Sequence, residues 1–200
     1  FLNDPRNALF RQYVRFIDEF EPRTLVLENV PGMLSLSDGH VFEQITREIE
    51  KRGYNISARI LFAAHYGVPQ ARWRLIIIGS RSKPIPEFPE PTHYATGRAN
   101  FRGGKTLTFR LLPLHKQVLA PAVTVSDALS DLPRLGRKEG GDVVRYQRKA
   151  QSDYAKLMRN GNLETYNHYA GFLSPQNMER LKYIRPGGSW RDIPFHLLPK

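Results

Sequence analysis

A carboxylate follows a short apolar run in the first part of this 200-residue chain. Leu25, Val26 and Leu27 are typical of a buried strand, and Glu28 and Asn29 come directly after them. In an open α/β sheet, ligands bind at the carboxyl ends of the parallel strands. We therefore expect Glu28 at the mouth of a site, where a carboxyl group can donate or share a proton. The structural alternative is that Glu28 caps a helix or pairs with an arginine.

A second polar set leads into another apolar strand. In "GVPQARWRLIIIGS", Gln70, Arg72 and Arg74 alternate along the chain, so that in extended backbone their side chains share one face. An amide and two guanidinium groups in such an arrangement can clamp an anion or the hydrogen-bonding edge of a base. A single arginine there would be explained by ordinary polarity at a strand end, but three aligned groups favour a binding site.

The elements around these residues alternate between helix and strand, which predicts a layered α/β sheet. Hydrophobic periodicity and cap signals define them. The expected elements are a helix over 6–20, a strand over 24–28, a helix from an N-cap at Asp38 to a stop at Gly53, a strand over 54–62 and a fully buried strand over 74–80.

The composition changes after Ser80, and we place a domain boundary near residue 81. A proline-rich connector over 83–93 cannot continue a sheet interior. We interpret the later glycine pairs, such as Gly140–Gly141, as turns. The remaining expected elements are a strand over 105–112, a helix over 125–132, basic loops over 134–149 and a helix over 174–184 with Ser174 as its N-cap and Pro175 in its first turn.

Three ordered motifs carry a resemblance to a known family. "DPRNALF" (4–10), "ENV" (28–30) and "QARWR" (70–74), with their spacing, resemble the DNA cytosine-5 methyltransferases. "VTVSDALSDLP" (123–133) and the stretch over 166–194 extend the similarity downstream.

The resemblance implies part of a class I S-adenosylmethionine-dependent, Rossmann-like sheet, followed by a smaller irregular basic segment. Residues 1–81 would be the C-terminal part of the catalytic domain. Residues 82–200 would be the proline-rich connector and the beginning of the target-recognition region.

The resemblance also implies a chemistry. In the family, a cysteine thiolate adds to carbon 6 of a flipped-out cytosine, and carbon 5 then takes a methyl group from S-adenosylmethionine. Glu28 would donate toward ring nitrogen N3 and Arg74 would hold O2, while Arg72 would order the catalytic loop or a phosphate.

By the same resemblance, further residues would bind the substrate or the cofactor. Asn29, Val30 and Gln70 are the other substrate-binding candidates, with Asn29 expected to hold the loop backbone. Asp4 and Leu9 are the cofactor candidates. A core position in the first helix explains Leu9 equally well.

The chain has no cysteine, so it holds neither a cysteine nucleophile nor a thiolate metal site. By resemblance, the Pro-Cys loop and the glycine-rich cofactor loop should precede Phe1, and the late motifs should follow Lys200. We therefore expect an internal piece or one part of a split enzyme, inactive alone. Its partners would be the missing N-terminal and C-terminal parts or a complementary chain.

The charge indicates a polyanionic partner, and double-stranded DNA comes first. The formal net charge is +11, with 10 basic and 9 acidic residues in 1–80 against 20 and 10 in 81–200. A solvated basic loop is the alternative for the basic cluster. The candidates for DNA-backbone contacts are Arg134, Arg137, Lys138, Arg145, Arg148 and Lys149.

Other classes of function fit less well. The six histidines show no metal-ligand spacing, and no apolar run reaches the roughly 20 residues of a membrane span. The sequence thus favours a cytoplasmic, bacterial, nucleoid-associated protein without a metal. A non-catalytic nucleic-acid-binding subunit, an RNA cytosine-5 methyltransferase and a ribosomal-type basic protein remain as alternatives. The long basic segment favours DNA over RNA.

Overall fold

The computed structural model describes residues 9–99, 101 and 118–199. The chain forms two compact units, Phe1–Val125 and Ser126–Lys200, and each is considered by itself. The predicted boundary near residue 81, which follows a change in composition, falls inside the first unit. The strand expected over 105–112 lies outside the described residues.

A three-stranded sheet forms the centre of the first unit. Its strands are β1 (Thr24–Asn29), β2 (Asn55–Phe62) and β3 (Trp73–Ser80), in the order β1-β3-β2. β1 and β2 point the same way, as expected for an open α/β sheet, but β3 lies between them and is antiparallel to both. The carboxyl ends of β1 and β2 therefore lie beside the beginning of β3, at the same end of the sheet.

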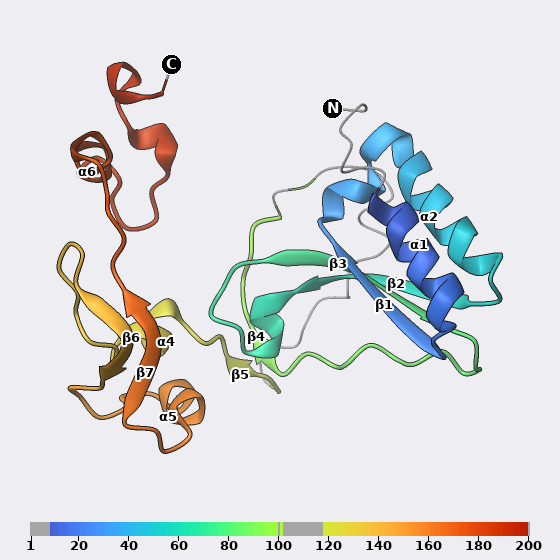
Figure 1. Ribbon diagram of the computed structural model, residues 1–200, viewed down its shortest axis with the longest axis horizontal. Helices are drawn as coiled ribbons and strands as arrows, with labels where there is room; N and C mark the ends of the chain where they lie inside the picture. The colour runs from blue at the N-terminus through green and yellow to red at the C-terminus, as the bar shows by residue number, and fades with distance from the viewer. Residues whose placement is uncertain (1–8, 100, 102–117, 200) are drawn as a thin grey trace. The chain divides into compact units, whose positions relative to one another are not determined.

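Two helices, α1 (Leu9–Phe20) and α2 (His40–Glu50), lie side by side against this sheet (Figure 1). Apolar residues at helical spacing turn Ile17, Ile45 and Ile49 inward, where they join Leu75 and Ile77 of β3 in one core. Both β3 residues are fully buried. Removing side chains of this size from water contributes about 1.5–3 kcal/mol each, so this cluster fixes the sheet and helices together.

The predicted start of the second helix is wrong by one residue. Gly39, not Asp38, is the N-cap. Asp38 belongs to a 3-10 turn, η3 (Leu36–Gly39), and has a φ of 55°. Gly39 has φ of 92°, a left-handed conformation that glycine adopts without the steric cost of a side chain. The predicted stop is confirmed, because Gly53 closes the last turn with its N–H donating to Glu50 at 2.9 Å.

The predicted burial of β1 holds for only part of the strand. Leu25 is 5% exposed, whereas Val26 is 59% exposed. β1 is an edge strand within the described sheet, and α1 and α2 cover the face of Leu25. On β2 the predicted alternation is confirmed, with Ala58, Ile60 and Phe62 all buried on one face.

Short elements connect these parts of the first unit. The connector after Ser80 stays outside the sheet as expected, and β4 (His93–Tyr94) pairs in parallel with β5 (Ala120–Pro121). Two 3-10 turns complete the unit, η2 (Pro31–Leu34) directly after β1 and η4 (Ala63–Tyr66) directly after β2.

The second unit contains a strand pair that the sequence analysis missed. Part of the predicted basic loop, including Gly140–Gly141, is strand β6 (Gly140–Arg145), which pairs antiparallel with β7 (Glu164–Tyr169). The other elements of the unit and its approach are α4 (Val125–Leu129), α5 (Asp153–Arg159), α6 (Pro175–Leu181), η5 (Trp190–Asp192) and η6 (Phe195–Leu197).

Two helices expected here are present but shorter than predicted, since α4 ends at Leu129 and α6 at Leu181. The N-cap prediction is confirmed, because the Ser174 hydroxyl accepts the Asn177 N–H at 3.2 Å. An ion pair joins the buried Asp131 to Arg159 at 2.6 Å, and the Arg159 guanidinium lies 3.6 Å from the centre of the Tyr146 ring. This ion pair therefore belongs to the interior of the unit.

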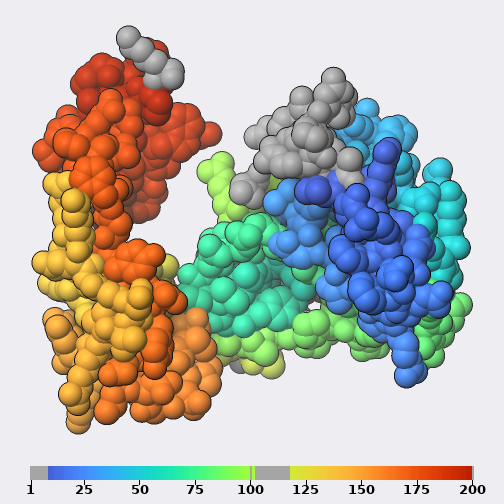
Figure 2. Space-filling model, in the orientation of Figure 1, coloured from blue at the N-terminus to red at the C-terminus, as the bar shows by residue number. Residues whose placement is uncertain are grey.

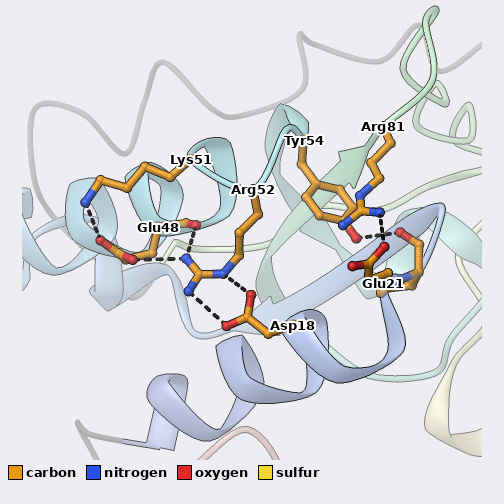
Figure 3. A network of polar contacts seen from close by, with 8 residues as sticks. Asp18, Glu21, Glu48, Lys51, Arg52, Tyr54 and Arg81 are labelled. Atoms are coloured by element: carbon orange, nitrogen blue, oxygen red, sulfur yellow. Dashed lines mark hydrogen bonds and ion pairs between the residues drawn. The ribbon is translucent and has the colours of Figure 1, made fainter.

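A polar network fastens the end of the first unit that lies away from Glu28 (Figure 3). Arg52, after α2, donates two hydrogen bonds to the Asp18 carboxylate of α1, at 2.6 and 3.0 Å. It also donates to Glu48, at 2.7 Å to the carbonyl and at 3.0 Å to the carboxylate. Beside it, Arg81 pairs with Glu21 at 3.1 Å (Figure 3). The network ties both helices to the strand ends and so resists sliding of the helices over the sheet.

This network predicts a loss of stability in acid. The hydrogen bond from Arg52 holds the pKa of Asp18 below its ordinary value, and the bonds from Lys51 and Arg52 do the same for the pKa of Glu48. The stabilisation is complete above the ordinary carboxyl pKa values of about 4 and is lost as the pH falls through the lowered values.

Thermal unfolding of the chain between about pH 6 and pH 3 should therefore show a falling midpoint, and Asp18→Asn should flatten that dependence. Glu50→Gln, at an exposed carboxylate of α2, is the control and should show the same pH dependence as the wild-type chain. Equal slopes for wild type and Asp18→Asn would contradict this role of the network.

Candidate active site

The antiparallel course of β3 brings Glu28 and Arg74 together. Glu28 stands opposite Ile76 in the register, so Arg74, two residues earlier on β3, is its diagonal neighbour on the same face. The Arg74 Nε contacts the Glu28 carboxylate, and the Arg74 Nη1 donates to the Trp73 carbonyl at 2.7 Å. The side chains are 22% and 52% exposed for Arg74 and Glu28, so the pair is open to solvent.

Arg74 also lines a pocket of about 440 Å³ that is shared with Gln70 and Arg72. The three predicted clamp residues thus border one cavity, although β3 begins only at Trp73. Backbone hydrogen bonds hold the segment that leads into β3. The Gln70 N–H donates to the Val68 carbonyl at 2.7 Å, and the Arg72 carbonyl accepts the Ala63 N–H at 2.8 Å. Glu28 does not line this pocket and is joined to it through Arg74.

The residues after β1 form another part of the wall of this pocket. The Asn29 side-chain oxygen accepts the Val30 N–H at 2.8 Å, a geometry that holds the backbone where the chain leaves the strand. Pro31 then begins the 3-10 turn η2, whose Met33 and Leu34 are buried in the core. Val30 is therefore held at the pocket wall by anchors on both sides.

A second pocket of about 510 Å³ adjoins the first. Its lining is mainly apolar, with Leu9, Tyr13 and Met33 among the side chains, and it contains Asn29. Val30 and Gly32 line both pockets, so one short segment separates a polar cavity from an apolar one. Both volumes lie in the range of small-molecule sites. Burial raises the pKa of Tyr13, whose hydroxyl donates to the Val26 carbonyl at 3.1 Å.

The other predicted site residues lie elsewhere. Asp4 lies outside the described residues. The candidates for DNA contacts belong to the second unit, where all six are exposed: Arg134, Arg137, Lys138, Arg145, Arg148 and Lys149. Across the part of the chain that the structure describes, no group of three or more His, Asp or Glu side chains could hold a metal ion, and no helix is long and apolar enough to span a membrane.

Sequence reasoning missed several lining residues of the polar pocket. Gly32, Ser35 and Phe101 contribute to its wall. The Pro31–Gly32 step after Glu28 and Asn29 was a signal for a turn at the site. For Phe101 there was no signal in the sequence. Its ring packs edge to face on Trp73, with the ring centres 5.6 Å apart, and no local pattern encodes that contact.

Comparison with known proteins identifies the family. The model of the C-5 cytosine-specific DNA methylases matches residues 2–184. The chain belongs to this family. It is 34% identical over 188 residues to the type II methyltransferase M.AgeI of Thalassovita gelatinovora, covering 92% of this chain and 43% of that protein.

Other similar proteins come from distant organisms. The chain is 31% identical to the DNA (cytosine-5)-methyltransferase PliMCI of Paracentrotus lividus, over 94% of this chain and 12% of that protein. A solved Escherichia coli structure, described as a prophage-encoded DNA modification methyltransferase, superposes with a TM-score of 0.54 at 19% identity, over 90% of this chain and 51% of the other. The chain thus spans about half or less of the length of these relatives, and the last match shows a shared fold.

The exposure of the Glu28–Arg74 pair predicts that it adds little to folding. Glu28→Gln should leave the free energy of unfolding within about 1 kcal/mol of wild type, as for other exposed ion pairs. Leu25→Ala, three residues earlier on the same strand but buried, should cost about 2–5 kcal/mol. Denaturant titration of both variants measures the difference. A loss for Glu28→Gln as large as that for Leu25→Ala would make Glu28 a structural residue.

Proposed function

We propose that this chain is the part of a DNA cytosine-5 methyltransferase that holds the flipped-out cytosine while its carbon 5 is methylated. The observation that supports this most is the Glu28–Arg74 contact beside the pocket of Gln70 and Arg72. The relatives are DNA methyltransferases by name, so a site for a cytosine is the function to test against this geometry.

The chemistry of cytosine calls for two different groups side by side. Carbon 5 becomes nucleophilic only after a thiolate has added to carbon 6, and that addition places negative charge on N3 and O2. These two atoms flank a single ring carbon, so an acid for N3 and a cation for O2 must be neighbours. Glu28 and Arg74 meet that requirement, since proton donation and charge stabilisation both act where charge develops.

The polar pocket gives the base a place beside this pair. Arg74 lines the pocket and also contacts Glu28, so a base edge bound to Arg74 lies within reach of the half-exposed carboxyl group. In this proposal Arg72 orders a neighbouring loop or a phosphate, and Gln70 and Val30 border the cytosine ring. Asn29 keeps the backbone of that wall in place through its bond to the Val30 N–H.

The apolar pocket suits part of the methyl donor. Its lining of Leu9, Tyr13, Met33 and Val41 fits the hydrocarbon part of S-adenosylmethionine, with Asn29 as a polar contact at the shared wall. S-adenosylmethionine would supply the methyl group. The chain's own contribution is to hold that end of the cofactor next to the base pocket and to exclude water from the wall that separates them.

The proposal predicts where activity comes from. The chain has no cysteine and therefore no thiolate to attack carbon 6, so alone it should transfer no methyl group to a cytosine-containing duplex. A complete protein that contains this chain and a cysteine loop should transfer it. There, Glu28→Gln should lower the single-turnover rate by about 10²–10⁴, the usual contribution of a general acid.

Methyl incorporation from a labelled donor into duplex DNA, and into RNA of the same sequence, measures these rates. Turnover by the 200-residue chain alone, or an unaffected Glu28→Gln, would contradict the proposal. Transfer to RNA in preference to DNA would replace DNA by RNA as the substrate.

A separate prediction concerns Arg74. In the complete protein, Arg74→Ala should reduce turnover much more than duplex binding, because its charge is needed most once O2 becomes negative. Arg59→Ala, at an exposed arginine of the adjacent β2, removes the same charge and is the matched control. Equal losses in binding and turnover for Arg74→Ala would instead make Arg74 a phosphate contact.

A further inference from the structure

An exposed aromatic ring in the second unit holds two cations. The Arg137 guanidinium lies 5.4 Å from the centre of the Phe172 ring, and the Lys138 ammonium lies 5.2 Å from the same centre. Arg137 also donates to the Leu173 carbonyl at 3.2 Å. Phe172, Arg137 and Lys138 are all exposed. The exposed Phe172 ring therefore contacts two positively charged side chains at the surface.

The β6–β7 pairing builds this cluster from residues far apart in the sequence. Gly140 stands opposite Tyr169, and the ladder continues outward with the Ala170 N–H donating to the Glu139 carbonyl at 2.8 Å. The residues that enter β6 are thereby opposite those that leave β7, and the two segments lie beside each other at the surface (Figure 2). The cluster thus rests on strand pairing and not on a free loop.

The ring restricts cations that would otherwise move freely. A cation–π contact at an exposed site is weak, but two on one ring restrict both charges to the surroundings of that ring, where they stay exposed to solvent. Neighbouring cations held in this way match a stretch of phosphate backbone, which is the dominant electrostatic feature of DNA. Glu139 opposes them, although its carboxylate is engaged by the Gly136 N–H at 2.5 Å.

We propose that Arg137, Lys138 and Phe172 form a phosphate-binding site for the DNA backbone, in which Phe172 is a positioning residue for the two cations. The sequence predicts Arg137 and Lys138 only as members of a diffuse basic segment. The structure distinguishes them by their shared ring. This inference rests on the proposed function in that it takes DNA as the partner, but it requires no methyl transfer.

Binding of the 200-residue chain to a labelled duplex, measured by fluorescence anisotropy over a series of salt concentrations, tests the site. Arg137→Ala and Lys138→Ala should each weaken binding and lower the salt slope by about one. Phe172→Leu keeps the charge, so it should weaken binding about two- to five-fold with the slope unchanged. Phe172→Tyr should restore wild-type binding, and Glu139→Gln should strengthen it.

Two controls match these variants within the same unit. Lys156→Ala removes an equal charge from α5, and Phe195→Leu removes another exposed ring. Circular dichroism confirms that each variant is folded. An unchanged affinity for Phe172→Leu, or a loss for Lys156→Ala equal to that for Lys138→Ala, would overturn the site and leave only bulk charge. Neither result bears on methyl transfer, and a complete protein without methyltransferase activity would overturn the proposed function but not this site.

Discussion

The antiparallel insertion of β3 between β1 and β2 is the constraint on which the candidate site depends. The register of β3 against β1 places Arg74 diagonally from Glu28. Its register against β2 pairs Trp73 with Phe62, so the residues Gln70–Arg72 that lead into β3 lie beside the carboxyl end of β2. A slip of one residue would move Arg74 to the opposite face of the sheet. The fully buried Leu75 and Ile77 oppose such a slip because they would leave the core with it.

Much of this arrangement could be predicted from sequence, and the limits have physical causes. Alternation and helical spacing are local, so they gave the α/β class, the three strands and the gathering of Gln70, Arg72 and Arg74. The antiparallel direction of β3 and the strand β6 depend on partners distant in the chain, which no local pattern encodes. The exposure of Val26 follows from its place on an edge strand, and the apolar run alone could not show it.

The chain contains two arginine–carboxylate pairs in opposite environments. Asp131 and Arg159 are 3% and 12% exposed, and the Tyr146 ring packs on the guanidinium. Removing either partner would therefore leave a buried charge unpaired. Glu28 and Arg74 are partly exposed, and Arg74 also lines a polar cavity. Asp131–Arg159 is thus a structural ion pair. Glu28 also pairs with an arginine, as the structural alternative expected, and what distinguishes the Glu28–Arg74 pair is its exposure to solvent.

The most direct test of the central claim, that Glu28 and Arg74 act on the base as one unit, is a double-mutant cycle. Single-turnover methyl transfer is measured for a complete protein that contains this chain, for Glu28→Gln, for Arg74→Ala and for the two combined. Because both groups stabilise the same charge on neighbouring atoms, the account predicts that the double variant is about as slow as the slower single variant. Losses that multiply independently would contradict it.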